Sequence, residues 1–133
     1  MSNISAVTQG VHHLGLTVED IHATRDFFVA ALGFSEVGQK TDYPAIFISD
    51  GSVMLTLWQV QHEGASFDRK ANIGLHHFAL RLAPGIDFTE LYNTLNNRED
   101  VTIEFKPEAL GESGLQHMMC AIPSNIRLEL IAA

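Results

Sequence analysis

Apolar side chains recur at three- and four-residue spacing in two segments of the chain, as they do in a helix that buries one face. The first segment contains Phe27, Phe28, Ala31 and Leu32, and the second contains Phe88, Leu91, Tyr92 and Leu95. Within each segment, the polar residues fall on the side of the helix opposite the apolar residues. The pattern therefore predicts two amphipathic, half-buried helices.

Residues that start and stop helices flank both segments. Asp20 precedes the first segment and is suited to accept hydrogen bonds from the free amides of a helix start, and Gly33 tolerates the left-handed conformation that follows a helix end. The second helix is expected to begin near Asp87 and to fray through Asn96-Asn97. Each helix is thus delimited by the sequence alone.

Short runs rich in β-branched and apolar residues follow each helix and predict strands. These runs are Ala45–Ser49, Val53–Val60, Val101–Phe105, Leu115–Ile122 and Ile126–Ile131. The pairs Asp50-Gly51 and Ser124-Asn125 lie between consecutive runs and predict one hairpin turn in each half. The polar stretch 61–72 reads as the connection between the halves.

An internal repeat links the two halves. His12-His13, followed by Leu14-Gly15-Leu16, recurs about half a chain later as His76-His77, followed by Phe78-Ala79-Leu80. Each half then reads as strand, helix and further strands. A βαβββ unit cannot bury both faces of its sheet alone. We therefore expect an α+β fold in which two βαβββ modules form a cupped mixed β-sheet with helices outside.

Length and composition favour a single domain over residues 1–133, with module one at about 9–60 and module two at about 73–133. The apolar runs are too short for a membrane helix and no signal region opens the chain, so a soluble cytoplasmic protein is expected.

One cysteine, Cys120, excludes an internal disulfide, and its thiol is expected to be buried and inert. A net charge of −8 without clustered Lys or Arg argues against nucleic acid as a partner.

Three residues at matching strand positions are candidates for a metal site. His13 and His77 lie on the expected opening strands of the two halves, and Glu129 lies within the apolar closing strand Leu128-Glu129-Leu130. A carboxylate between core leucines is costly unless it is paired or bound to metal. Two imidazoles and one carboxylate leave coordination positions open for water or substrate.

The ordered set of segments resembles the vicinal oxygen chelate superfamily, the group of glyoxalases, bleomycin-resistance proteins and extradiol dioxygenases. The segments that carry the resemblance are His13–Asp20 with Phe27-Phe28 and Leu32-Gly33-Phe34 in the first half, and His77–Leu80 with Leu128–Ile131 in the second. They span nearly the whole chain. The resemblance implies paired βαβββ modules around a divalent metal ion and a homodimer, with the cup formed either within one chain or between two.

By this resemblance, His13, His77 and Glu129 occupy three of the four usual ligand positions. The fourth falls on Thr56 or, if the hairpin is one residue longer, on its neighbour. Thr56 is a weak neutral ligand that departs from the glyoxalase I pattern. The implied activity is that of a metal-dependent glyoxalase-like lyase or isomerase, in which an ion (Fe, Mn, Ni or Zn) chelates a small vicinal-oxygen substrate and stabilises an enolate. Two alternatives remain: a metal-independent protein that sequesters a drug or metabolite, and an Fe(II)-dependent extradiol-type dioxygenase.

Neighbouring side chains complete the expected site. Glu129 and His117 are the candidate proton shuttles, and Thr56, Trp58 and Met119 are candidates for substrate contact. Strand alternation is expected to turn His12 and His76 to the opposite face. A local basic pocket formed by Arg81 or Arg127 would favour an anionic substrate in spite of the negative net charge.

Overall fold

The computed structural model describes residues 5–64 and 66–133 of the chain. In chain order its elements are β1 (His13–Val18), α1 (Ile21–Leu32), β2 (Ser35–Lys40), β3 (Ala45–Ser49), β4 (Met54–Gln59), β5 (Phe78–Arg81), α2 (Phe88–Asn96), β6 (Thr102–Ala109), β7 (Gln116–Ile122), the short 3-10 turn η1 (Pro123–Asn125) and β8 (Ile126–Ala132). Both halves therefore have the βαβββ order.

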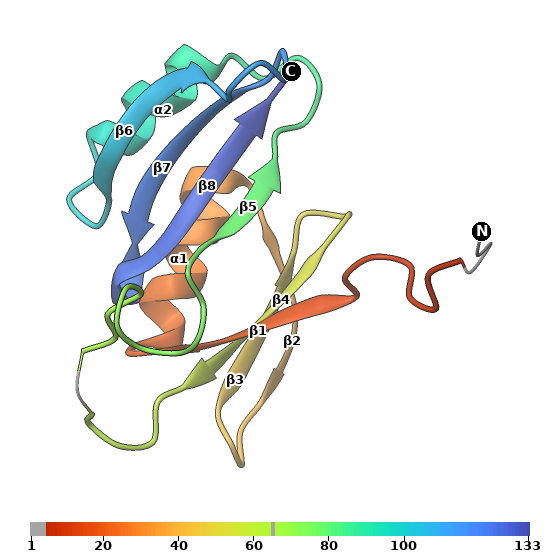
Figure 1. Ribbon diagram of the computed structural model, residues 1–133. Helices are drawn as coiled ribbons and strands as arrows, with labels where there is room; N and C mark the ends of the chain where they lie inside the picture. The colour runs from red at the N-terminus through yellow and green to blue at the C-terminus, as the bar shows by residue number, and fades with distance from the viewer. Residues whose placement is uncertain (1–4, 65) are drawn as a thin grey trace.

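The strands form two four-stranded mixed sheets with the same topology. Their orders are β1-β4-β3-β2 and β5-β8-β7-β6, and the first strand of each module pairs parallel with the last. Figure 1 shows the second sheet above the first, with α2 behind the upper sheet. The α+β class and the paired βαβββ modules are confirmed, and the hydrogen bonds of the strands stay within each module.

The expected helix boundaries are also confirmed. The side chain of Asp20 accepts hydrogen bonds from the backbone amides of His22 and Ala23, and Gly33 follows α1 with φ 74. Asp87 caps α2 by accepting from the amide of Glu90. These contacts satisfy amides that a helix start leaves without partners.

Strand β2 is the element that the hydrophobic pattern did not locate. Its sequence, Ser-Glu-Val-Gly-Gln-Lys, is largely exposed at the edge of the first sheet, and its pairing with β3 shifts register between Glu36 and Gly38. An exposed, bulged edge strand has few apolar side chains to bury, so it lacks the alternation by which strands are recognised.

One apolar core joins the two modules. Helix α1 contacts β2, β3, β4 and the turn η1, which leads into β8 of the other module. Phe27, Phe28, Leu57, Met118 and Leu130 all belong to the same buried cluster. Side chains alternate along a strand, so the residues between these core positions lie on the opposite faces of the sheets.

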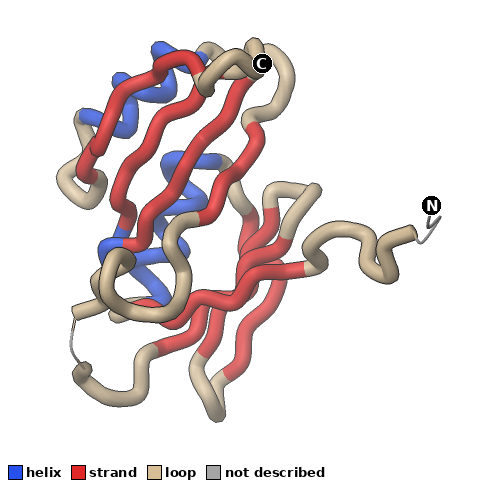
Figure 2. The backbone as a smooth tube through the Cα atoms, viewed as in Figure 1, coloured by secondary structure: helices blue, strands red, loops and turns tan. Residues whose placement is uncertain are grey.

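Two segments lie outside the sheets and helices. Figure 2 shows the N-terminal stretch extending away from β1 and the long connection from β4 to β5 passing beside both sheets. In the described part of the chain, no helix is long and apolar enough to cross a membrane.

Candidate functional site

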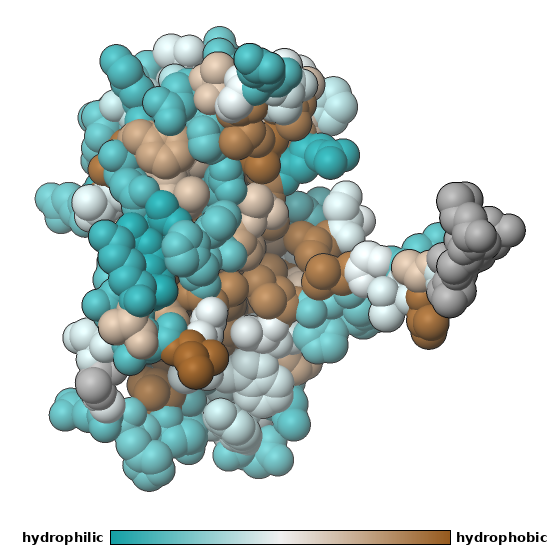
Figure 3. All heavy atoms as spheres, in the orientation of Figure 1, coloured by the Kyte–Doolittle hydropathy of each residue, from teal (hydrophilic) through white to brown (hydrophobic). Residues whose placement is uncertain are grey.

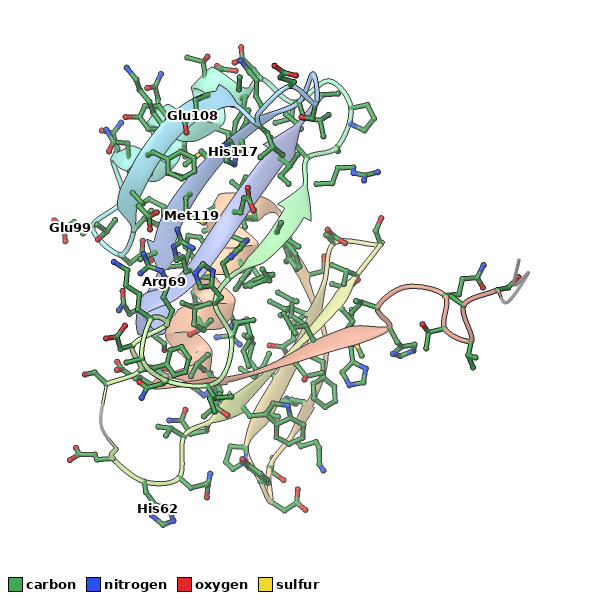
Figure 4. All side chains as sticks on the ribbon, viewed as in Figure 1. His62, Arg69, Glu99, Glu108, His117 and Met119 are labelled. Atoms are coloured by element: carbon green, nitrogen blue, oxygen red, sulfur yellow. The ribbon has the colours of Figure 1, made fainter. Side chains whose placement is uncertain are left out.

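The polar residues of the second sheet lie on the face that α2 leaves open. Along β7 and β8, Met118, Cys120, Leu128 and Leu130 enter the core. The alternate residues His117, Met119 and Glu129 therefore point the other way. Met119 pairs with Glu129 across the two strands, which places these three side chains on one patch. Figure 4 shows His117 and Met119 on β7, with Glu108 beside them on β6.

Glu129 joins two imidazoles. Its Oε2 lies 2.6 Å from Nδ1 of His117, and its Oε1 lies 3.1 Å from Nε2 of His77. The side chains of Glu129 and His117 are only 10% and 15% exposed, so the contact between them is largely shielded from water, whereas the side chain of His77 is 33% exposed. Nε2 of His117 is 3.7 Å from Oε1 of Glu108, and the ring of Phe105 packs against the imidazole. A buried carboxylate is thus stabilised by histidines from two other segments.

His77 reaches this group from just outside the sheet. Strand β5 begins at Phe78, so His77 precedes the strand on which the sequence placed it. Ala79 pairs with Glu129, and alternation turns His77 toward the same face. His76 is exposed to solvent but does not face away from this group as expected. Its Nδ1 lies 2.7 Å from Nδ1 of His77 and 3.3 Å from Nη1 of Arg127.

The first sheet carries the other candidate residues. Gly15 pairs with Thr56 and Thr17 with Trp58, while His13 pairs with Met54, so His13, Thr56 and Trp58 share a face. Nε1 of Trp58 donates a hydrogen bond of 2.9 Å to Oγ1 of Thr56. A Cβ at Gly15 would lie only 3.2 Å from that hydroxyl oxygen, so the absence of a side chain at Gly15 avoids a close contact with Thr56.

Aromatic rings extend this face of the first sheet. Tyr43 meets Trp58 edge-on with ring centroids 4.9 Å apart, and Phe47 packs at 6.1 Å. Nζ of Lys40 lies 5.6 Å from the centre of the Trp58 ring. The first module therefore presents an apolar and aromatic surface, whereas the second presents ionisable side chains.

The structure brings together two of the three expected metal ligands, His77 and Glu129. The imidazole of His13 instead contacts that of His12, with their Nδ1 atoms 2.9 Å apart. Over residues 5–64 and 66–133, no three His, Cys, Asp or Glu side chains of this single chain are grouped to hold a metal ion. Thr56 and Trp58 share the face of the first sheet with His13, and His117 and Met119 share the face of the second sheet with Glu129.

A network of charged side chains continues from His76. Nε and Nη2 of Arg127 donate to the two carboxylate oxygens of Glu104 at 2.8 and 2.6 Å, and Nη2 of Arg69 lies 3.8 Å from the same carboxylate. The hydrogen bond from Arg127 is the main reason that the pKa of Glu104 is lowered. Burial, followed by the charges of Arg127, His77 and Arg69, lowers the pKa of His76.

Arg69, Glu104 and Glu108 were missed by the sequence reading. Arg69 lies in the polar connection, where no periodicity indicates which way a side chain points. The sequence predicts a basic pocket formed by Arg81 or Arg127, and the position of Arg127 two residues before Glu129 places it on the same strand face. The register shifts of β6 hide the placement of Glu104 and Glu108, because simple alternation fails across a bulge.

Arg69 and Arg127 line a cavity of about 1310 Å³ between β1, the connection before β5 and the end of the second sheet. Apolar and polar side chains both contribute to its wall, among them Leu75, Ser124 and Ile126. The space-filling view shows a hollow between the upper and lower halves, with hydrophilic side chains on its left rim (Figure 3). The cavity can therefore accommodate a small molecule with both apolar and charged parts.

Cys120 takes no part in this face. Its side chain points into the core and is fully buried, and burial raises the pKa of the thiol to about 11. The expectation of a buried thiol is confirmed.

Comparison with known families gives one match that covers most of the chain. The model of the glyoxalase/bleomycin resistance protein/dioxygenase superfamily matches residues 10–130. A search of curated protein sequences gives no match.

Solved structures with the same fold cover nearly all of the chain at low sequence identity. The glyoxylase/bleomycin resistance protein/dioxygenase domain from Frankia sp. EAN1pec superposes with a TM-score of 0.80 at 20% identity, covering 95% of this chain and 93% of that one. A glyoxalase family protein from Enterococcus faecalis gives 0.74 at 20%, with coverages of 92% and 97%. Lactoylglutathione lyase from Agrobacterium tumefaciens gives 0.69 at 15%, with 96% of each chain covered. These likenesses show the shared fold.

Proposed function

Because the chain belongs to the glyoxalase/bleomycin resistance protein/dioxygenase superfamily, we propose that it is a metal-dependent, glyoxalase-like lyase or isomerase acting on a small molecule with two adjacent oxygen atoms. The observation that carries the proposal is the contact of Glu129 with both His77 and His117 on the open face of the second sheet. On this face, which α2 does not cover, a carboxylate and two imidazoles of the kinds that bind metal ions lie in contact.

The donor chemistry of this group fits a divalent cation. Imidazole nitrogen and carboxylate oxygen are ligands that iron, manganese, nickel and zinc all accept. His77 and Glu129 already lie in contact and need no large rearrangement to share an ion. His13 would be the third ligand, and Thr56 would stand beside it as a weak neutral donor.

The side chains around the ion would transfer protons and contact the substrate. When bound, the ion supplies Lewis-acid chemistry, holding two substrate oxygens and stabilising the negative charge of an enolate. Oε2 of Glu129 and Nδ1 of His117 are close enough to exchange a proton, so this pair would take a proton from substrate carbon and return it. Met119, Thr56 and Trp58 would contact the rest of the substrate.

We further propose a homodimer in which the first module of one copy faces the second module of its partner. The separation of the candidates supports this, since His13, Thr56 and Trp58 lie on one sheet and His77, Glu129 and His117 on or beside the other. Each cup would then combine the aromatic face of one copy with the ionisable face of the other.

Metal analysis tests the first proposal. Untagged protein purified without chelator should contain near-stoichiometric metal, which His77→Ala should lose. His22→Ala is the matched control, because His22 is exposed at the start of α1. Absence of metal, together with no uptake of nickel, zinc, manganese or ferrous iron, would refute the proposal and favour the metal-independent sequestering protein.

Mixing two defective variants tests the shared cup. Neither His13→Ala nor Glu129→Gln should bind metal alone. After unfolding and refolding together in equal amounts, one intact cup in each mixed dimer should restore about a quarter of the wild-type metal content. If every cup lies within one chain, the mixture stays empty and the shared arrangement is wrong.

A further inference from the structure

The charged residues beyond His76 are not needed for metal binding, and they form a separate feature of the cavity. Arg69 comes from the connection before β5, Arg127 from β8 and Glu104 from β6. Three elements that are distant in sequence thus converge on one carboxylate. Figure 4 shows Arg69 in front of the lower ends of β7 and β8, below Met119.

The two guanidinium groups are unequally paired. Arg127 uses two nitrogens on the carboxylate of Glu104, at 2.8 and 2.6 Å, which leaves little of that carboxylate for another partner. Arg69 has one ion-pair contact among the described residues, and at 3.8 Å it is longer than a hydrogen bond. Its Nε is buried without a hydrogen-bond partner there, although the side chain as a whole is 34% exposed. Arg69 is thus held near the cavity with most of its donors unused.

The charge of this group is positive. Arg69 and Arg127 face a single carboxylate, and Lys70 adds a third positive charge that also acts on Glu104. These are three of only eight Lys and Arg residues in a chain of net charge −8. Glu19, Glu63 and Asp68 line other parts of the cavity, but in the described part of the chain none lies within 4 Å of either guanidinium.

We propose that Arg69, supported by Arg127, binds the carboxylate of a small organic acid in this cavity. A planar guanidinium presents paired N–H donors that match the two oxygens of a carboxylate. Among the residues that line the cavity, Arg69 and Arg127 exceed Glu104 by one positive charge, because Lys70 does not line it. One positive charge balances a monoanion better than a phosphate group, which carries nearly two negative charges at neutral pH. Glu104 holds Arg127 in place and sets this charge balance.

This subsite deepens the proposed function by specifying the class of substrate. Contacts connect it to the candidate metal ligands: Arg127 to His76 at 3.3 Å, His76 to His77 at 2.7 Å, and His77 to Glu129 at 3.1 Å. A substrate whose adjacent oxygens lie at His77 and Glu129 would place a carboxylate on its other end beside Arg69. The inference rests on the proposed function only for this link to substrate.

Benzoate and its neutral isostere benzamide test the subsite in metal-free protein. The full chain, kept in chelator at constant ionic strength, is titrated with each while the side-chain Nε–H signals of arginine are followed by NMR. Benzoate should shift the Arg69 signal saturably, and benzamide should not. Similar binding of both compounds, or tighter binding of inorganic phosphate than of benzoate, would overturn the assignment.

Variants localise the effect. Arg69→Gln should weaken benzoate binding by roughly tenfold or more, the effect of losing a charge-assisted hydrogen bond. Glu104→Gln should strengthen binding, because both guanidinium groups lose their internal counter-ion. Lys106→Gln is the matched control, since it removes a positive charge from the exposed side of β6 outside the cavity. Equal affinities of wild type and Arg69→Gln would refute the subsite.

The metal-free design separates the two proposals. Failure of benzoate to bind would refute the carboxylate subsite and leave the metal content unaffected. If the protein binds no metal but still binds benzoate, the cavity binds organic acids without metal chemistry.

Discussion

Replacing Glu129 by Gln removes one negative charge and keeps the shape of the side chain. The carboxylate is largely buried and holds Nδ1 of His117 at 2.6 Å and Nε2 of His77 at 3.1 Å. In metal-free protein these are its contacts with ionisable groups, so the variant isolates what the histidines contribute to stability. The amide can still form the hydrogen bond with His117 but cannot form an ion pair with His77.

The expected loss follows from the shorter contact. A hydrogen bond that involves a charged group contributes about 1.5–3 kcal/mol, and a 10% exposed carboxylate loses little of this to solvent. The entropy of unfolding is about 2.1 cal/mol/K per residue, or roughly 0.28 kcal/mol/K for 133 residues. A loss of about 2 kcal/mol therefore lowers the Tm by about 7 °C.

Thermal and urea unfolding, followed by circular dichroism in chelator, measure this loss. Met119→Leu is the matched control, because Met119 pairs with Glu129 across the strands and the exchange costs less than about 1.5 kcal/mol. A Glu129→Gln variant as stable as wild type, or more stable, would refute the reasoning. The carboxylate would then be held at the expense of stability, as buried charges can be.

Three further predictions concern the core and the charged network. Phe27→Ala removes a fully buried ring and should lower the free energy of unfolding in urea by about 3–5 kcal/mol, and a loss below about 1 kcal/mol would contradict the described core. Cys120, with a pKa of about 11, should resist iodoacetamide at pH 8 until denaturant is added; reaction in the native protein would show that the thiol is accessible. Arg127 lowers the pKa of Glu104, so the stability that Glu104 contributes is present above the ordinary carboxyl pKa and is lost as pH falls through the lowered one. At pH 7 the free energy of unfolding of the wild type should therefore exceed that of Glu104→Gln, by less than about 1 kcal/mol because the Glu104 side chain is 40% exposed. The difference should vanish near pH 2. A difference that grows on acidification would show that the assigned sign is wrong.

The sequence predicted those parts of the fold that local chemistry determines. The Asp20 cap and the Gly33 stop delimit α1 because both act on backbone groups within a few residues. The Ser124-Asn125 turn follows for the same reason, since both residues adopt positive φ at the hairpin. Strand β2 was not found, because its register depends on pairing with β3 and not on its own apolar residues.

The sequence could predict only those site residues that lie on regular strands, where the alternation of side chains shows which face each residue occupies. His117 and Glu129 lie on regular strands, and the sequence reading named both as candidates for one site; the structure places them in contact. Arg69 lies in an irregular connection, and its approach to Glu104 depends on a bulged strand, so no local pattern indicates that the two meet. Whether His13 joins the group depends on how two modules face each other, which no residue encodes alone.

The internal repeat explains why the two modules differ chemically. Gly15 pairs with Thr56 in the first module as Ala79 pairs with Glu129 in the second, and a histidine stands two residues before each small residue. The equivalent positions thus hold a hydroxyl in one module and a carboxylate in the other. The hydroxyl accepts the indole N–H of Trp58, whereas the carboxylate contacts His77 and His117. At this symmetric position the first module thus contributes to an aromatic surface, and the second contributes to a cluster of ionisable groups.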